Sequence, residues 1–402
     1  MPAISPLAPA GFPDLKPIAG VRLAAYAAGV RYAGRNDVML AELAPGTTIA
    51  GVLTQSTTPG APVDWCRASL PGGSVRAIVV NSGNANVFTG RSGREVCERT
   101  AAAAAQLFGC SPREIFISST GVIGEPPPAE KIVNALPNIV PLLDAAAWEP
   151  AARAIMTTDT FPKGATATAT IDGANVRING FAKGSGMIAP DMATMLSYIF
   201  TDAEFDAASL DRMLRQAAHV SFNMLSVDTD TSTSDTCVLL ANGAAGPVSE
   251  PEFQEVLTEG CIRMTEILAR DGEGAKHLLR CTVRAALDET EARMVAKSLV
   301  NSPLIKTMVH GADPNVGRIL MAVGKCFTAT IRTDVTDAWV NGHAVVRGGT
   351  RVDFDEPMVR AALATEVVDL EVSLGVGSAS ATAYGCDLTT GYVEENAAYY
   401  SS

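Results

Sequence analysis

The sequence predicts a mixed α/β protein. Short runs rich in β-branched residues alternate with helical patterns along the whole chain, and this alternation is typical of sheets combined with helices. At 402 residues the chain is long enough for two domains, or for one large α/β unit with a substantial core. Hydrophobic residues make up 47% and charged residues 18% of the chain, which is typical of a globular protein rather than of a disordered or fibrous one.

The first half of the chain contains two expected strands, each followed by a polar loop. Residues 74–80, SVRAIVV, predict a strand that ends in the polar segment NSGNANVFTG at residues 81–90. An alanine-rich helix is expected over residues 94–108, since alanine has the highest helix propensity. A second, short strand at residues 115–117 leads into the glycine- and proline-containing loop SSTGVIGEPPP at residues 118–128.

Two helices and a strand are expected in the second half. Residues 206–218 place apolar side chains on one helical face, which indicates an amphipathic helix. Those side chains are Leu210, Met213, Leu214 and Ala217. Ser249 and Glu252 have the spacing of a capping box at the start of the next helix, which is expected to end at the glycines of residues 270–276. The strand HLLRCTVRAAL should follow at residues 277–287.

Charge, hydropathy and cysteine content exclude several classes of protein. The net charge of −12 argues against nucleic-acid binding, which requires clustered Lys and Arg. No apolar run approaches the length of a membrane-spanning helix, and the proline-broken N-terminus lacks the pattern of a signal peptide. The eight cysteines form no CxxC pair and the four histidines do not cluster with them, so neither a zinc site nor a disulfide framework is expected. These features predict a cytoplasmic protein.

Cofactor motifs are absent or incomplete. HExxH, GxSxG and GxxxxGK[ST] do not occur in the sequence. GVGSAS at residues 375–380 lacks the last glycine of a dinucleotide-binding fingerprint. The acidic run DTDTSTSDT at residues 228–236 lacks the glycine and the terminal glutamate of a calcium loop. Neither a metal nor a resident cofactor is therefore expected.

Polar residues gather in loops that the pattern places at strand ends, where binding sites are often found. The segments are residues 81–86, 118–121, 157–160, 183–185, 228–236 and 271–273. Each of them alone is more typical of a turn, because Ser, Thr, Asn and Asp side chains hydrogen-bond to nearby backbone groups. Taken singly, none of them identifies a site.

The segment KGSGMIAPDMATMLSYIF, residues 183–200, carries the most specific candidate. It places Thr194 between a glycine-containing loop and a strand-like apolar run. A threonine hydroxyl needs a base to act as a nucleophile, and an N-terminal threonine carries that base in its own α-amino group. The chain could generate such a residue if the Thr194 hydroxyl attacked the Ala193 carbonyl and water hydrolysed the resulting ester. Many ordinary loops also contain Gly and Thr, so the residues alone leave this open.

Motifs spread over nearly the whole chain resemble those of one known family. Besides the segment around Thr194 they are PIAGVRLAA, VVNSGNANVFTG, SSTGVIG, AIMTTDTFPK, VDTDTSTSDT, RDGEGA, NSPLIKT, ADPNVGRI and AYGCDLTTGYVEENAAYYSS. In content and order these stretches resemble the ornithine acetyltransferase family of arginine biosynthesis, whose members are bifunctional glutamate N-acetyltransferases and N-acetylglutamate synthases. The number and order of the stretches make the resemblance highly specific.

The resemblance implies that the chain cleaves itself between Ala193 and Thr194. The products would be an α chain, residues 1–193, and a β chain, residues 194–402, with Thr194 at its new N-terminus. The resemblance also implies the fold of self-processing aminopeptidase-like proteins, in which helices pack on β-sheets. The implied assembly contains two α and two β chains.

The reaction that the resemblance implies is ping-pong acetyl transfer. Thr194 takes the acetyl group from N2-acetylornithine and glutamate then accepts it, so no cofactor is required; acetyl-CoA is a second candidate donor. Thr120 and Gly121 correspond to the family's oxyanion hole, whose donors stabilise the tetrahedral intermediate. The positions that correspond to substrate contacts are Thr157, Lys183, Thr194, Glu273, Asn396 and either Ser401 or Ser402. Lys183 suits a carboxylate, and Glu273 suits an ammonium group.

Three positions depart from the family's pattern. Lys276 and His277 stand where Thr-Lys is common, and Val316 stands where the family has tryptophan. These departures bear on substrate preference, whereas Thr194 and the two oxyanion-hole positions match the family.

Three other interpretations stay open at this point. Water could attack the acetyl-threonine, which would make the chain an acetylornithine deacetylase or another amidohydrolase. A related acetyltransferase of secondary metabolism would carry similar motifs. The non-enzymatic alternative is a binding protein in which Thr194 stays inside an intact chain.

Overall fold

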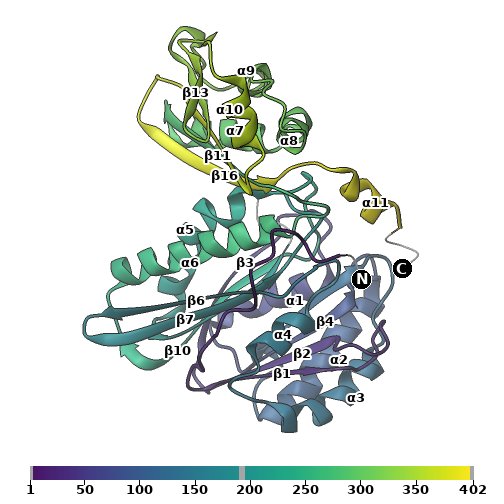
Figure 1. The fold of residues 1–402 in the computed structure, drawn as a ribbon. Helices are drawn as coiled ribbons and strands as arrows, with labels where there is room; N and C mark the ends of the chain where they lie inside the picture. Colours follow the sequence, from purple (N-terminus) through teal and green to yellow (C-terminus); the bar gives the residue numbers. More distant parts are fainter. Residues whose placement is uncertain (1–2, 190–194, 399–402) are drawn as a thin grey trace.

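The computed structural model of the protein describes residues 3–189 and 195–398, and within them the chain forms three β-sheets with helices packed against them (Figure 1). Helices and strands are interspersed along the chain. The predicted mixed α/β class, with helices packed on β-sheets, is therefore confirmed.

The first sheet lies in the lower part of Figure 1 and has the strand order β1-β2-β4-β5. Its strands are β1 (Val21–Tyr26), β2 (Val38–Leu43), β4 (Ala77–Asn84) and β5 (Ile115–Val122). β1, β2 and β4 are antiparallel neighbours, whereas β4 and β5 are parallel. The helices that cover one face of this sheet are α1 (Ala61–Ser69), α2 (Gly90–Phe108) and α3 (Ala129–Ile139).

The second sheet has the strand order β3-β10-β8-β7-β6. Its strands are β3 (Thr48–Leu53), β6 (Lys163–Ile171), β7 (Ala174–Lys183), β8 (Leu196–Glu204) and β10 (Thr236–Pro247). All neighbours are antiparallel except β8 and β10. The helices α5 (Ala207–Val220) and α6 (Glu250–Arg270) cover its outer face, where α5 packs on β3 and α6 packs on β6.

The first two sheets face each other across a shared hydrophobic core. Helix α4 (Trp148–Ala154) contacts strands of both sheets. The Trp148 ring packs edge-on against Phe181 and Phe200 of the second sheet, with ring centroids 6.4 and 5.4 Å apart. Such aromatic pairs add about 0.5–1.5 kcal/mol beyond the area that they bury. The resulting order of layers is helix, sheet, sheet, helix.

Strand β8 shows why the sequence after the predicted cleavage position is a nearly continuous apolar run. Leu196 and Phe200 point into the core between the two sheets, whereas Ile199 belongs to the core beneath α5 and α6. A strand that is buried on both faces lacks the polar alternation of a strand with one solvated face. Lys183 at the end of β7 pairs with Leu196, so the end of β7 lies beside the start of β8.

The third sheet forms the upper part of Figure 1 and has the strand order β14-β13-β12-β15-β11-β16-β9. Its strands are β9 (Leu225–Ser226), β11 (Leu278–Ala286), β12 (Asp337–Val340), β13 (His343–Arg347), β14 (Thr350–Arg351), β15 (Val367–Ser373) and β16 (Ala379–Cys386). The helices of this part are α7 (Glu289–Val300), α8 (Pro303–His310), α9 (Gly317–Gly324) and α10 (Glu356–Leu363). Helix α7 packs on β11 and β16.

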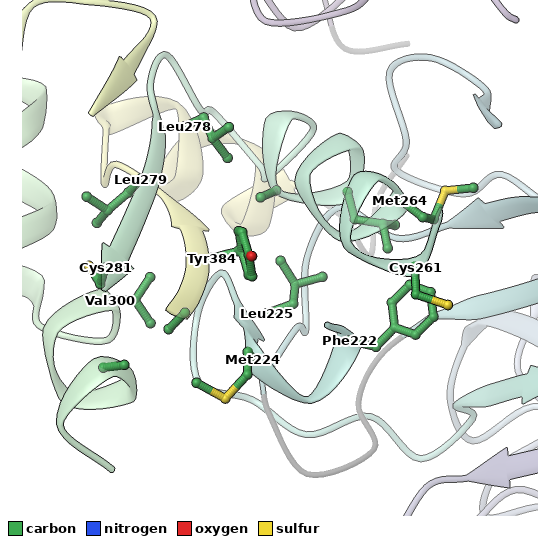
Figure 2. Packing of buried hydrophobic residues seen from close by; sticks show 14 of the residues in the cluster. Phe222, Met224, Leu225, Cys261, Met264, Leu278, Leu279, Cys281, Val300 and Tyr384 are labelled. Atoms are coloured by element: carbon green, nitrogen blue, oxygen red, sulfur yellow. The ribbon is translucent and has the colours of Figure 1, made fainter. Parts of the chain in front are cut away.

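One hydrophobic core joins the third sheet to the helices on the second sheet. Figure 2 shows this junction, where Leu225 of β9 lies between Met264 of α6 on one side and Leu279 of β11 on the other. Tyr384 of β16 belongs to the same buried cluster. The upper and lower parts of the molecule are therefore joined by shared apolar packing rather than by a polar linker.

The chain leaves the third sheet at the end of β16 and then forms α11 (Thr390–Ala398), which Figure 1 shows apart from that sheet and close to the N-terminal segment. Thr389 Oγ1 donates a hydrogen bond of 2.7 Å to the Gly274 carbonyl oxygen, so the start of α11 is held at the loop that follows α6. Short 3₁₀ helices lie at Leu70–Gly72, Pro112–Glu114, Val140–Leu142, Phe222–Met224 and Thr333–Val335.

Most of the predicted elements are confirmed within a few residues. The amphipathic helix is α5, the helix that ends before the glycines is α6, and the strand after them is β11. Two predicted loops begin too early, because β4 continues to Asn84 and β5 continues to Val122. The Ser119 hydroxyl donates to Asn81 Oδ1 over 2.6 Å, so polar side chains at the ends of these parallel strands satisfy one another.

The predicted capping box at the start of α6 is wrong. Ser249 is the N-cap residue, but its side chain accepts no hydrogen bond from the helix. Its backbone N–H, which Glu252 would bind in a capping box, donates instead to Asp172 Oδ2 over 2.7 Å. A carboxylate from the turn between β6 and β7 thus takes the place that the sequence pattern predicts for Glu252.

Candidate active site

A cavity of about 130 Å³ lies where several strand ends and loops meet. The predicted site residues that line it are Thr120, Gly121, Thr157, Lys183, Glu273 and Asn396. They come from β5, from the segment after α4, from the end of β7, from the loop after α6 and from α11. The fold therefore brings together every predicted site residue within the part of the chain that the structure describes.

The remaining predicted residues, Ala193, Thr194, Ser401 and Ser402, lie outside the described residues. Met195 and Leu196, which follow Thr194 in the sequence, line the cavity. The backbone N–H of Thr236 at the start of β10 donates to the Met195 carbonyl oxygen over 3.0 Å. This hydrogen bond fixes the beginning of β8 at the cavity wall.

Gly121 faces the backbone of β4 at short range. It is paired with Gly83 in the register of β4 and β5. Its φ of +126° lies where L side chains are rarely found, and a Cβ at this position would lie 2.3 Å from the Gly83 carbonyl carbon. Only glycine fits, and this close approach sets the position of Thr120 and Gly121 in the cavity wall.

Asp159 binds the backbone of Thr157 and of Gly184, the residue that follows Lys183. Its carboxylate accepts the Thr157 backbone N–H over 3.0 Å and the Gly184 backbone N–H over 2.6 Å. Lys183 Nζ lies 3.9 Å from Asp159 Oδ2, and only 8% of Lys183 is exposed. Burial lowers the pKa of Lys183, although the attraction of Asp159 opposes this effect. A buried cation at the cavity wall favours a ligand with a carboxylate.

Glu273 is held in place by a hydrogen bond from Asn396. Asn396 Nδ2 donates to Glu273 Oε2 over 2.6 Å. The Glu273 carboxylate lies over Gly186, where an added Cβ would be 2.3 Å from the carboxylate carbon, so any side chain at Gly186 would displace it. Burial raises the pKa of Glu273, although the hydrogen bond from Asn396 and the attraction of Lys183 oppose this effect.

One wall of the cavity consists of Ser232, Thr233, Ser234 and Asp235 directly before β10. These residues belong to the polar segment 228–236 named above, but none of them was among the predicted site residues. Asp235 is only 4% exposed. Its backbone carbonyl accepts the Thr54 N–H over 3.0 Å, which fixes this segment against the end of β3. Ser, Thr and Asp are typical turn residues, so composition does not distinguish this wall from an ordinary turn. The one usable signal is its place at the start of a strand.

The three departures from the family pattern do not line this cavity. Lys276 is exposed, and its backbone N–H donates to Asp387 Oδ1 over 2.8 Å. His277 Nδ1 lies 3.0 Å from Asp387 Oδ2. Val316 is buried in the same core as the third sheet. These positions therefore do not contact a ligand in the cavity directly.

The charges in the cavity suit a zwitterionic ligand. Lys183 supplies an ammonium group, whereas Glu273 and Asp235 supply carboxyl groups on other segments of the wall. A carboxylate and an ammonium group on one small ligand can each meet a group of opposite charge here. Thr120 and Thr157 add hydroxyl groups, which can donate or accept hydrogen bonds.

Two further findings concern metals and membranes. Across residues 3–189 and 195–398, no group of three or more His, Cys, Asp and Glu side chains is arranged to hold a metal ion. In the same part of the chain, no helix is long and apolar enough to cross a membrane.

The ArgJ family model matches residues 22–401 of the chain. A protein of Bradyrhizobium diazoefficiens named arginine biosynthesis bifunctional protein ArgJ is 47% identical over 411 residues, with 99% of each chain covered. A protein of the same name from Agrobacterium fabrum is 45% identical, again with 99% of each chain covered. The crystal structure of arginine biosynthesis bifunctional protein ArgJ from Bacillus halodurans is 36% identical with a TM-score of 0.50, and the match covers 51% of this chain and 100% of that chain.

Proposed function

The chain belongs to the ArgJ family, and from this premise we propose that it is an acyltransferase of arginine biosynthesis that moves an acetyl group from N2-acetyl-L-ornithine to L-glutamate. The observation that carries the proposal is the cavity that all six described residues of the predicted site line together. Its buried ammonium and carboxyl groups suit amino-acid substrates, which carry charges of both signs.

The nucleophile in this proposal is Thr194 after autoproteolysis. Its hydroxyl attacks the Ala193 carbonyl carbon, the peptide nitrogen leaves as the α-amine of Thr194, and water hydrolyses the ester to give Ala193 a free carboxylate. The products are the α chain, residues 1–193, and the β chain, residues 194–402. The pairing of β7 with β8 supports a stable cleaved form, because backbone hydrogen bonds would still join the two chains in one sheet.

Acetyl transfer then proceeds in two half-reactions. The Thr194 hydroxyl attacks the acetyl carbonyl carbon of acetylornithine, and the α-amino group takes the hydroxyl proton. Thr120 and Gly121 stabilise the oxyanion that forms. Collapse breaks the C–N bond, the proton passes to the leaving amine of ornithine, and acetyl-Thr194 remains. The glutamate amine attacks this ester, and N-acetylglutamate leaves as the threonine hydroxyl is restored.

Substrate recognition in this proposal uses both charges of the cavity. Lys183 binds the α-carboxylate of acetylornithine, and Glu273 binds its side-chain ammonium group. Thr157, Asn396 and a serine at the C-terminus, either Ser401 or Ser402, complete the contacts. The low exposure of Lys183 and Glu273, 8% and 7%, supports this assignment, because charge-assisted hydrogen bonds are strongest away from bulk water.

The test is acetyl transfer from acetylornithine that is labelled in its acetyl group. With glutamate present, label should appear in N-acetylglutamate, and double-reciprocal plots at several glutamate concentrations should be parallel. Without glutamate, ornithine release should stop after about one equivalent per site, because acetyl-Thr194 accumulates. Steady release of labelled acetate at the same rate would identify a hydrolase, and no release of ornithine would contradict the proposal. Acetyl-CoA in place of acetylornithine tests the second candidate donor.

The ionisation of Glu273 predicts the acid side of the pH profile. Glu273 must be deprotonated to bind an ammonium group, and its pKa is raised by burial and by Asp228, against the opposing effects of Asn396 and Lys183. The value of kcat/KM should therefore rise with pH through a pKa above that of an ordinary glutamate. In Asn396→Ala the carboxylate loses a hydrogen bond that lowers its pKa, so this rise should move to higher pH.

The measurement is kcat/KM for acetylornithine across the acid and neutral range in both proteins. If the acid limb keeps its position in Asn396→Ala, ionisation of Glu273 does not control binding. A lower profile with that unchanged position would then reflect only the loss of a substrate contact of Asn396.

The proposal also covers the assembly of the enzyme and its location in the cell. We place the enzyme in the cytoplasm as an assembly of two α and two β chains, without a nucleic-acid or membrane partner and without a resident cofactor. The eight free cysteine thiols, seven of them buried, suit a reducing compartment.

A further inference from the structure

Lys163 is a fully buried cation that the reaction above does not use. It is the first residue of β6, and its side chain is 0% exposed. Its Nζ donates to Asp159 Oδ1 over 2.6 Å and to Asp271 Oδ2 over 2.5 Å, and both of these carboxylate side chains are also 0% exposed. One ammonium group thus bridges two buried carboxylates that are far apart in the sequence.

Each of these carboxylates holds backbone that carries a cavity residue. Asp159 accepts the backbone N–H groups of Thr157 and Gly184, and Gly184 directly follows Lys183. Its two oxygens therefore fix one segment from the end of α4 and another from the end of β7. Because Lys183 Nζ lies 3.9 Å from Asp159 Oδ2, this carboxylate also helps to set the position of that cation.

Asp271 fixes the third segment. Its carboxylate accepts the Thr160 backbone N–H over 2.9 Å, and its backbone carbonyl accepts the Ser185 hydroxyl over 2.6 Å. The Ser185 carbonyl in turn accepts the Glu273 backbone N–H over 3.2 Å. The loop that carries Glu273 is therefore tied to the two segments that carry Thr157 and Lys183.

Attraction between opposite charges sets the charge states of Lys163 and Asp159, whereas burial and the nearby charge of Asp159 raise the pKa of Asp271 against the attraction of Lys163. Burial alone would lower the pKa of Lys163, but the charges of Asp159 and Asp271 outweigh it and raise that pKa above its usual value. Burial alone would raise the pKa of Asp159, but Lys163 and Lys183 hold it well below its usual value. Lys163 is therefore an ammonium group and Asp159 a carboxylate throughout the physiological pH range.

We infer that Lys163 is a positioning residue, which fixes the spacing between the segments of Thr157, Lys183 and Glu273 and thereby sets the affinity for the amino-acid substrate. The inference rests on the proposed function for the roles of those three residues. A displacement of about 1 Å in a binding site can cost roughly 10²-fold in activity, so a rigid link between segments from distant parts of the chain has a large effect.

The same link spans the proposed cleavage position. Asp159 and Lys163 precede residue 194, whereas Asp271 follows it. After autoproteolysis the ion pair between Lys163 and Asp271 would therefore join the α chain to the β chain inside the protein. Lys163 would then act together with the hydrogen bonds of Thr160 and Ser185 to Asp271, which join the same two chains.

The experiment compares Lys163→Met with a charge-balanced double variant, Lys163→Met with Asp271→Asn. The single variant leaves two carboxylates buried without their shared cation, and this can prevent folding. The double variant removes one charge of each sign, and the amide oxygen that Asp271→Asn introduces can still accept the Thr160 N–H. Asp159 also keeps Lys183 as its counter-ion. The double variant therefore removes the bridge that Lys163 makes between Asp159 and residue 271. It keeps the backbone N–H groups of Thr157 and Gly184 on Asp159, and the bonds of Thr160 and Ser185 to residue 271.

The expected result is a double variant that folds with a melting temperature near that of the wild type but has a KM for acetylornithine raised by about 10- to 100-fold. Its effect on KM should not be additive with that of Lys183→Met, because both act on one binding geometry. Glu291→Gln is the matched control, since Glu291 is a buried carboxylate of α7 that lies outside the cavity wall. It should lower stability and leave KM unchanged.

A double variant with wild-type KM, or with an effect strictly additive to Lys183→Met, would overturn the inference. Failure of the proposed function is a separate result, because wild-type enzyme would then not transfer acetyl groups at all. If the wild type does not transfer acetyl groups, crystal structures of the wild type and the double variant still test whether Lys163 sets the spacing of the segments. Displacement of Glu273 relative to Lys183 would support it, and unchanged placement of both would overturn it.

Discussion

Replacing Thr194 by alanine should leave an intact chain of 402 residues and 41.8 kDa and abolish acetyl transfer. The proposed mechanism uses the same hydroxyl to cut the bond after Ala193 and to accept the acetyl group, so one substitution removes both steps. Loss of a catalytic nucleophile typically lowers kcat by about 10⁶-fold. Intact mass measured under denaturing conditions should show two fragments that meet at this bond in the wild type and one species in Thr194→Ala.

Thr194→Ser is the matched control, because it keeps a hydroxyl and the α-amino group. It should be cleaved and should retain acetyl transfer. A single uncut species in the wild type would mean that the nucleophile is never released at a new N-terminus. The transferase proposal would then give way to a binding role.

Replacing Gly121 by alanine should lower kcat by about 10²–10³-fold, the usual cost of losing an oxyanion-hole donor. The added Cβ would lie 2.3 Å from the Gly83 carbonyl carbon and 2.6 Å from the Asn84 backbone nitrogen. Backbone atoms of a paired strand cannot move aside as a flexible side chain can, so the end of β5 must shift. Backbone strain at this φ adds a stability cost of about 1–3 kcal/mol. Steady-state kinetics and denaturant unfolding measure the two effects.

Gly124→Ala separates the loss of the oxyanion hole from general backbone strain. Gly124 also has a positive φ, +97°, but an added Cβ would meet no atom within 4 Å. Its variant should lose stability through strain alone and keep kcat near the wild-type value. Equal kcat values in the two variants would contradict the assignment of Gly121 to the oxyanion hole.

Several elements could be predicted because their cause is local. The apolar spacing of residues 206–218 is sufficient to define α5, and the glycines after Arg270 are sufficient to end α6. The prediction of a capping box failed because the residue that binds the Ser249 N–H is far from it in the sequence. Asp172 binds the Ser249 N–H, and no pattern around Ser249 reveals that a carboxylate from another turn lies there.

The residues that line the cavity also differ in how far the sequence could predict them. Thr120, Gly121, Thr157, Lys183, Glu273 and Asn396 could be named from motifs that resemble a family. Asp235 was missed although it lies in one of those motifs, because a run of Ser, Thr and Asp is equally typical of a turn. Lys163 was also missed although it ends the motif AIMTTDTFPK, because one of its two partners, Asp271, lies 108 residues away and the motif does not indicate that the lysine is buried.

Residue order alone thus defined the class of fold, the positions of most helices and strands, the family and the chemical types available for catalysis. These properties depend on hydrophobic periodicity and on motifs, and each of these is contained in a short stretch of the sequence. The tertiary structure decided which polar loops share a cavity, which carboxylate caps α6 and which cation links the segments that line the cavity. Those choices depend on contacts between distant segments, where burial leaves each charge with only the partners that packing brings to it.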